Sequence, residues 1–127
     1  MSPHVLTLLP ELLAVASLQA GICDIPDWAT TSVFLAFIRT STEVTLVCEE
    51  IKFPAETISE RGWRAFEVQG PLPFELIGVL ADLTSSLAIA GISVFSISTY
   101  STDYILVKED CLEKAVTSLQ KAGHTIQ

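Results

Sequence analysis

The sequence is poor in basic residues. Seven lysines and arginines face fifteen aspartates and glutamates, which gives a formal charge of −8 at pH 7. Such a surface repels the phosphate backbone of nucleic acids and the acidic headgroups of membranes. We therefore expect neither nucleic acid nor a membrane as a partner.

Cysteines and long apolar runs are also scarce. Cys23, Cys48 and Cys111 are widely spaced and form no CxxC pair, which argues against a disulfide framework and a zinc site. The apolar stretch of residues 5–20 follows no basic residue and is interrupted at Pro10, so it is a poor signal peptide. No stretch reaches the roughly 18 apolar residues of a membrane span. We expect a cytoplasmic protein with reduced cysteines and no metal site.

Motifs of catalysis are missing too. His4 and His124 are the two histidines, and both lie near the ends of the sequence, where they make poor general bases for a Ser or Cys nucleophile. The sequence contains no GxGxxG, P-loop, HExxH or GxSxG pattern. Acidic pairs such as Glu49-Glu50 have simpler roles at strand ends and helix starts. We expect no enzymatic activity and no cofactor.

Half of the residues are apolar, which suffices for one compact core or for two very small units that share a core. Short runs rich in branched and aromatic residues predict strands. The predicted strands cover residues 5–9, 33–40, 44–48, 63–68, 92–99, 104–108 and 124–126.

Apolar residues at helical spacing predict three helices. The first covers residues 11–19 and the second covers residues 74–90. The third begins at Asp110, where Glu113 would complete a capping box, and ends at Gly123.

The two halves of the sequence are similar to each other. Residues 41–50 (STEVTLVCEE) match residues 101–110 (STDYILVKED) at an offset of 60 residues, and the first strands of both halves align at the same offset. A duplicated strand–helix–strand–strand unit explains this match. We expect an α+β fold of two units, residues 1–60 and 61–127, joined at residues 49–62. The first unit is abbreviated, because it lacks a second helix.

Four segments resemble a known family. They are residues 62–64 (GWR), 70–80 (GPLPFELIGVL), 87–95 (LAIAGISVF) and 98–107 (STYSTDYILV). These segments resemble the ACT domains of the aspartate-kinase regulatory type, in particular a tandem-ACT group that includes cytosolic arginine sensors and small stand-alone bacterial relatives. The resemblance is close in the second half and loose in the first. It implies ferredoxin-like βαββαβ units, with antiparallel sheets that carry their helices on one face.

The resemblance also implies an amino-acid-binding regulatory module whose ligand sits between two paired ACT units. In such families one unit offers the approach to its first helix and the turn after its second strand, and the paired unit offers backbone at the start of that strand. Carried over by position, the first group is Pro73, Phe74, Glu75, Leu76, Gly78, Val79, Thr99, Tyr100 and Asp103, and the second is Ser93 and Val94. The arginine sensors use an acidic residue two positions before the glycine; Leu76 stands there in this sequence, and the acid is Glu75.

The residues themselves support a similar interpretation. A helix start near residues 74–78 leaves backbone amides unpaired and suits a carboxylate, while Asp103 suits an ammonium group, so together they would hold a free α-amino acid. Simpler roles stay open: Asp103 as a turn cap, Glu75 as an acid favourable to the helix start, Gly78 as a packing position and Tyr100 as an ordinary strand aromatic.

Two functions remain after these exclusions. In the first, the protein is a sensor whose amino-acid ligand shifts the population of a surface that binds a regulated protein partner. In the second, it is a structural or interaction module that keeps the fold without a ligand. Both favour a homodimer, because a small duplicated domain leaves sheet edges or faces to cover. The sequence does not identify the amino acid.

Overall fold

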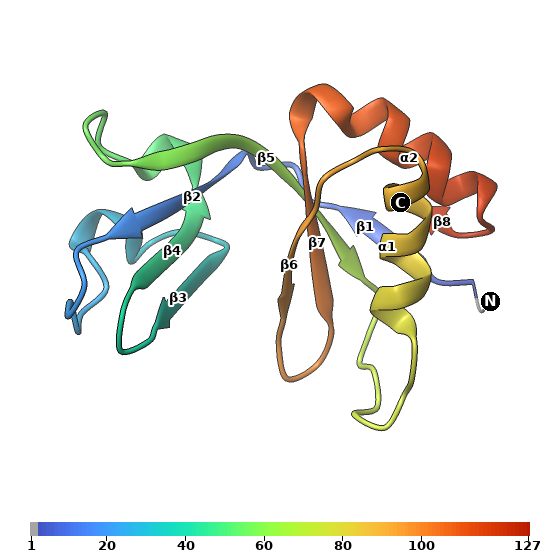
Figure 1. The fold of residues 1–127 in the computed structure, drawn as a ribbon, viewed down its shortest axis with the longest axis horizontal. Helices are drawn as coiled ribbons and strands as arrows, with labels where there is room; N and C mark the ends of the chain where they lie inside the picture. Colours follow the sequence, from blue (N-terminus) through green and yellow to red (C-terminus); the bar gives the residue numbers. More distant parts are fainter. Residues whose placement is uncertain (1–2) are drawn as a thin grey trace. The chain divides into compact units, whose positions relative to one another are not determined.

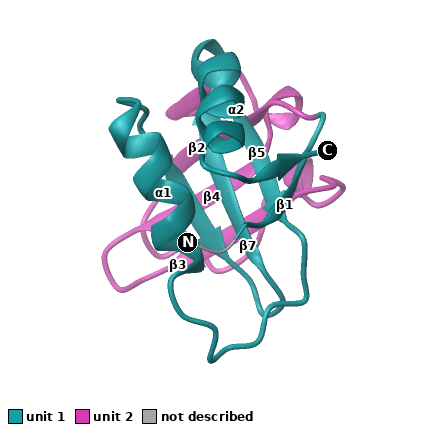
Figure 2. Cartoon of the chain, turned by 90° about the vertical axis from the view of Figure 1, so that its right-hand side faces the viewer, with its two compact units in different colours: residues 1–10, 64–127 teal, residues 11–63 magenta. Residues whose placement is uncertain are grey.

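A computed structural model describes residues 3–127, and the chain forms two compact units. Unit 1 combines the residues up to Pro10 with residues 64–127, and unit 2 consists of residues 11–63 (Figure 2). This division differs from the one expected at residues 60 and 61, because the N-terminal strand belongs to the unit formed by the second half. No helix within residues 3–127 is long and apolar enough to cross a membrane.

Unit 1 has the βαββαβ order of a ferredoxin-like fold (Figure 1). Its elements along the chain are the second half of β5 (Ser59–Val68), α1 (Val79–Ile89), β6 (Phe95–Ser98), β7 (Asp103–Lys108), α2 (Leu112–Lys121) and β8 (Thr125–Ile126). The strand β1 (Val5–Leu8) is added to this set. Across the sheet the strands follow the order β8, β1, β5, β7, β6.

Both helices of unit 1 pack on one face of its sheet. They share a single buried apolar cluster with the strands, and burial of this cluster is the main source of stability for the unit. Its members are Leu83 and Leu87 of α1, Ala115 and Leu119 of α2, and Leu6, Phe66, Val68, Ile105 and Val107 of the strands, together with Val79 and Ile92.

The N-terminal strand β1 fills the space between β5 and β8. Leu6 is fully buried, and it lies opposite Val68 in an antiparallel pair and opposite Ile126 in a parallel pair. The backbone N–H of Gln127 donates to the carbonyl of Leu6 at 2.7 Å. The match at an offset of 60 had aligned β1 with β5 as equivalent strands of two repeats. That alignment is wrong, because β2 (Leu13–Leu18) lies next to β4 (Val44–Glu49) as β5 lies next to β7, so β2 and not β1 corresponds to β5.

Unit 2 is a four-stranded arrangement in the order β3, β4, β2, β5. Its strands are β2 (Leu13–Leu18), β3 (Leu35–Arg39), β4 (Val44–Glu49) and the first residues of β5. The helix expected over residues 11–19 is wrong, since β2 pairs with β4 along all six of its residues. A short apolar run is compatible with the period of a helix and with that of a strand, and here pairing with β4 makes it a strand. Within residues 11–63 the helical elements are the 3-10 turns η1 (Asp27–Ala29) and η2 (Glu50–Lys52).

The internal repeat is present in the two hairpins, with a corrected register. Arg39 pairs with Val44 in β3–β4, and Ser98 pairs with Asp103 in β6–β7, so the hairpins correspond at an offset of 59 (98 − 39 and 103 − 44). Matching backbone bonds close the turns, from Thr40 N–H to the Glu43 carbonyl and from Thr99 N–H to the Thr102 carbonyl. A shift of one residue reverses which side of a strand each side chain takes, so the sequence offset of 60 is not the structural one.

Both α-helices begin later than the sequence patterns predict. Helix α1 begins at Val79 and not at residue 74, because Gly78 has a φ of +87°, which a right-handed helix does not allow. Helix α2 begins at Leu112 after the 3-10 turn η3 (Glu109–Cys111), and no side chain caps it, so the capping box is wrong. Its end at Gly123 is confirmed: His124 N–H donates to the Leu119 carbonyl at 3.1 Å, as in a Schellman motif.

The remaining strand predictions are confirmed with shifted ends. Strand β5 begins at residue 59, inside the segment expected to join the halves, whereas β6 is shorter than the predicted 92–99. The other boundaries agree within two residues. Such shifts at element ends are normal, because the last residues of an element have the weakest patterns.

A buried threonine fixes the β6–β7 turn relative to the loop before α1. Thr102 is 7% exposed, and its Oγ1 donates to the Val68 carbonyl at 2.6 Å. The Leu72 N–H donates to the Ser101 carbonyl at 2.7 Å. A Cβ at Gly70 would lie 3.0 Å from that carbonyl oxygen, so the approach needs glycine. These contacts hold residues 70–72 against the turn.

A pair of histidines lies between β1 and the end of α2. His124 is 3% exposed, and its Nδ1 accepts the His4 N–H at 3.1 Å, so neutral His124 carries its proton on Nε2. The rings of His4 and His124 stack with centroids 5.6 Å apart, and Asp82 Oδ2 lies 3.9 Å from His4 Nε2. Burial, followed by the charge of His4, lowers the pKa of His124, against an opposing effect of Asp82.

We predict that Thr102→Val lowers the free energy of unfolding by about 1–3 kcal/mol, because the Val68 carbonyl loses its donor in a buried position. The measurement is urea unfolding followed by circular dichroism. The matched control is Ser101→Ala, which removes an exposed hydroxyl next door and should change the free energy by less than about 0.5 kcal/mol. Equal midpoints for the two variants would contradict the role given to Thr102.

We also predict an acid-dependent loss of stability that depends on His124. Because its pKa is lower in the folded protein than the ordinary value of 6.5, the unfolded chain binds the proton first. The contribution of neutral His124 to the free energy of unfolding is therefore complete above pH 6.5. It is lost as the pH falls from 6.5 through the lowered pKa of the folded protein. Urea unfolding of His124→Asn, which keeps an acceptor for His4, should show a shallower decline between pH 7 and pH 5. An identical decline of the free energy of unfolding in the unmodified protein and the variant would contradict the role given to His124.

Candidate functional site

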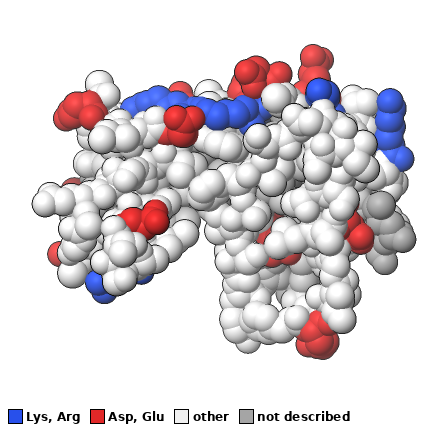
Figure 3. All heavy atoms as spheres, viewed as in Figure 1, with Lys and Arg blue, Asp and Glu red and all other residues white. Residues whose placement is uncertain are grey.

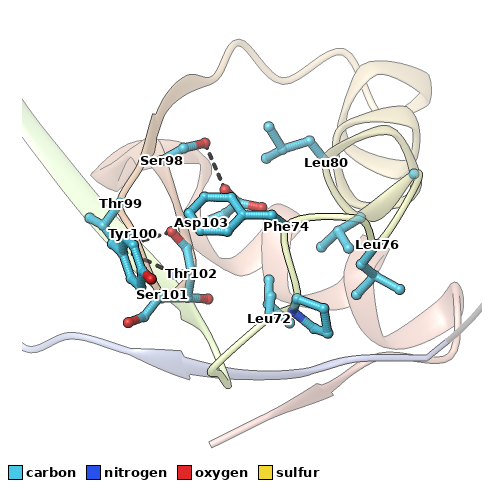
Figure 4. Close-up of a pocket in the computed structure, with 13 residues that line it drawn as sticks. Leu72, Phe74, Leu76, Leu80, Ser98, Thr99, Tyr100, Ser101, Thr102 and Asp103 are labelled. Atoms are coloured by element: carbon cyan, nitrogen blue, oxygen red, sulfur yellow. Dashed lines mark hydrogen bonds between the residues drawn. The ribbon is translucent and has the colours of Figure 1, made fainter.

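A cavity of about 320 Å³ lies in unit 1 between the loop before α1 and the β6–β7 turn (Figure 4). The loop and the first turn of α1 form one wall, and the end of β6, its turn and the first residue of β7 form the other. The lining residues are Leu72, Pro73, Phe74, Leu76, Gly78, Val79, Leu80 and residues 98–103.

The cavity brings together most of the residues expected to bind a ligand. Eight of them line it, namely Pro73, Phe74, Leu76, Gly78, Val79, Thr99, Tyr100 and Asp103. Glu75 belongs to the same loop but is exposed and is not part of the lining. Ser93 and Val94 are exposed residues just before β6, whereas the cavity lies at the other end of that strand.

Five lining residues were not expected from the sequence: Leu72, Leu80, Ser98, Ser101 and Thr102. Ser101 and Thr102 lie in the same turn as the predicted residues Thr99, Tyr100 and Asp103. The Ser/Thr-rich sequence of this turn could have indicated them as lining residues too. Ser98 joins the site because it lies directly opposite Asp103 in the hairpin. Finding it requires the pairing register within the β6–β7 hairpin, which the sequence patterns do not provide.

Asp103 is the acidic group of the cavity. Its side chain is half-buried, and its Oδ1 accepts a hydrogen bond from Ser98 Oγ at 2.6 Å (Figure 4). The serine thus fixes the carboxylate at the start of β7 and leaves Oδ2 toward other donors. Turn-capping bonds in this segment come from Thr99, whose Oγ1 accepts the Thr102 N–H at 3.2 Å. Asp103 is therefore not needed to close the turn.

The start of α1 supplies backbone donors. Its first helical bond runs from the Asp82 N–H to the Gly78 carbonyl at 2.9 Å. The preceding amides at residues 79–81 are therefore the N-terminal groups that a helix leaves without intrahelical partners. Gly78 and Val79 both line the cavity. The partial positive charge of this helix end thus lies at the cavity that contains Asp103.

Apolar side chains of the lining come from the loop before α1 and the start of that helix, together with the Tyr100 ring. Phe74 and Tyr100 are 73% and 82% exposed, and their rings meet edge to face with centroids 5.0 Å apart. Leu76 is 47% exposed, while Val79 at the helix start is buried. No lysine or arginine occurs between Arg64 and Lys108, and Figure 3 shows no basic atoms on the visible side of the β6–β7 turn and the loop before α1. The site has one apolar wall, one wall with hydroxyl groups and an acidic group, and no basic side chain lines it.

Other clusters of reactive residues lack the features of an active site. Cys48 is fully buried, and burial raises the pKa of its thiol, which disfavours the nucleophilic thiolate. His4, His124 and Asp82 lie together without a nucleophile among them. Within residues 3–127, no group of three or more histidine, cysteine, aspartate or glutamate side chains could hold a metal ion.

Several known proteins resemble this chain in sequence or in fold. Human cytosolic arginine sensor for mTORC1 subunit 1 is 32% identical over 92% of this chain, which spans 42% of that protein's length. A crystal structure of an Agobacterium tumefaciens protein is 32% identical, with a TM-score of 0.93 over 100% of this chain and 94% of that one. The regulatory subunit of Thermus thermophilus aspartate kinase shares the fold at 13% identity, with a TM-score of 0.58 and coverage of 93% and 96%.

The family model of the ACT domain matches residues 58–121, which is 64 of the 127 residues. The matched segment contains β5, α1, β6, β7 and α2, and it includes the whole lining of the cavity. The βαββαβ order of unit 1 agrees with the fold that the sequence motifs predict. This chain belongs to the ACT domain family.

Proposed function

We propose that this chain is a regulatory protein that binds a free α-amino acid in the cavity of unit 1. The observation that carries the proposal is the placement of the Asp103 carboxylate and the α1 amides around one cavity in an ACT domain. The name of one relative supports it, since that protein is a cytosolic arginine sensor.

The two ends of an amino acid match the two polar groups of the cavity. The ammonium group pairs with Asp103, whose Oδ1 is already bound by Ser98 and whose Oδ2 accepts a ligand proton. The carboxylate accepts hydrogen bonds from the amides of residues 79–81 at the start of α1. The side chain then lies along Phe74 and Leu76.

A second ACT unit completes this site. The cavity is open, and its aromatic walls are exposed, so a further surface is needed to remove the ligand from water. Ser93 and Val94, which lie away from the cavity of their own unit, supply backbone to the cavity of a paired unit. The resulting homodimer is a cytoplasmic protein without catalytic activity. Ligand binding favours one of its conformations and thereby controls contact with a protein partner.

A second candidate is an interaction module that keeps the fold without a ligand. Phe74, Leu76, Ile77 and Tyr100 are exposed apolar residues on the loop and turn of unit 1. Contiguous exposed apolar residues are typical of protein interaction sites. In this alternative the same surface binds a protein directly.

The two candidates differ in their response to free amino acids. We predict that one or a few of the twenty amino acids raise the stability of the protein, by about 2.7 kcal/mol at one hundred times the dissociation constant. A thermal-shift screen followed by titration calorimetry measures this effect. Asp103→Asn should weaken binding by about 1.5–3 kcal/mol, because the ammonium loses its charged acceptor.

Glu75→Gln is the matched control, since it removes a carboxylate from the same loop outside the cavity lining. It should bind like the unmodified protein. A screen without any response in a folded protein favours the interaction module. Equal weakening by both substitutions would show a general effect of charge and would remove the role proposed for Asp103.

We further predict that the protein is a dimer at micromolar concentration. Sedimentation equilibrium with and without the bound amino acid measures the assembly state. Val94→Asp places a charge on the segment proposed to complete the neighbouring site, and it should weaken both dimerisation and ligand binding. A monomer that binds the amino acid with full affinity rules out the intersubunit arrangement.

A further inference from the structure

The charges around the cavity restrict the kind of amino acid that it accepts. Of its lining residues, Asp103 alone carries a charge at neutral pH. Glu75, which lies between the lining residues Phe74 and Leu76 in the sequence, is outside the lining. The segment between Arg64 and Lys108 has no basic residue. Ser93 and Val94, which we assign to the completion of the site, are neutral as well.

A ligand with a charged side chain would leave one charge without a partner. The α-ammonium group of any amino acid uses Asp103, so the second cation of lysine or arginine would have no acidic side chain among the lining residues. The carboxylate side chain of aspartate or glutamate would lie there without a base. A charge that is removed from water without a partner is strongly unfavourable.

The wall formed by the loop and α1 favours an apolar side chain, and the opposite wall adds uncharged hydroxyl groups from the β6–β7 turn. Leu72, Leu76 and Leu80 lie on the loop and the first turn of α1, and Phe74 and Tyr100 form an edge-to-face pair near them. Phe74, Leu76 and Tyr100 are exposed without ligand. A ligand side chain placed among them removes apolar surface from water on both partners, which is the usual source of affinity in such pockets.

We infer that the ligand is an α-amino acid with an uncharged, apolar side chain of the leucine, methionine or phenylalanine class, and that the cavity rejects arginine and lysine. The inference rests on the proposed function, because it concerns the same cavity. It separates this chain from its human relative, whose name gives arginine as the ligand.

Pairs of amino acids that differ in one charge test this inference. Norleucine is lysine without the ε-ammonium group, and citrulline is an uncharged relative of arginine. Titration calorimetry of the unmodified protein should show norleucine, leucine, methionine or phenylalanine binding at least about tenfold more tightly than lysine, arginine or glutamate. Citrulline should bind more tightly than arginine but less tightly than the apolar amino acids.

A second variant reverses the preference. Leu76 is the most exposed aliphatic residue of the lining, so Leu76→Glu adds a hydrated carboxylate to the cavity with little effect on folding. The ratio of norleucine affinity to lysine affinity should fall by more than about tenfold, to below one. Ile77→Glu is the matched control: it adds the same charge one residue away, at a side chain that is 92% exposed and outside the lining, and the ratio should not change.

The outcomes separate this inference from the proposed function. Preferential binding of apolar amino acids, with a reversal in Leu76→Glu alone, supports both. Arginine or lysine binding that exceeds norleucine binding and is lost in Asp103→Asn overturns the inference and keeps the function. The absence of binding by every amino acid in the folded protein overturns both.

Discussion

The hydrogen bond from Thr102 to the Val68 carbonyl is the contact on which the candidate site depends. It joins the β6–β7 turn to the strand β5, and the Leu72 N–H adds a bond to the same turn. The cavity has one wall from the turn and the other from the loop before α1, which are separate along the chain. Because the threonine is buried, water does not compete for this bond, so the geometry of both walls is set by one side chain.

The site combines a fixed acid with a helix end and apolar walls. Ser98 holds Asp103 in place, and Gly78 ends the loop and starts α1 beside it. Neither feature uses a basic side chain: the first is a hydrogen bond between two side chains, and the second is a backbone conformation. A site of this kind recognises the common part of an amino acid with few residues and leaves specificity to the lining, where single substitutions alter charge or shape. Different ligands in related proteins are compatible with the same fold for this reason.

Sequence patterns predicted the elements of unit 1 better than those of unit 2. The alternation in β5, the heptad-like spacing in α1 and the glycine after α2 each favour one structure. In unit 2 the run LAVASL fits a helix or a strand, and pairing with β4 decides. The start of α1 was placed at residue 74 because Gly78 looked like a helix residue; its positive φ is not visible in the sequence. Most lining residues on the loop and the turn were predicted, but Leu72, Ser101 and Thr102 were not, and Ser98 depends on the hairpin register.

The position of β1 makes unit 1 discontinuous along the chain. Its sheet needs β1 from the first ten residues and β8 from the last three, with the fifty-three residues of unit 2 (11–63) between β1 and the rest. Unit 2 is contiguous, so all of its strands are synthesised before most of unit 1. In unit 1, β1 has both of its neighbours only after β8 has been synthesised. Closing that long loop costs chain entropy before the core of unit 1 forms. The segment matched by the family model lacks both β1 and β8, and it is therefore smaller than the unit that folds.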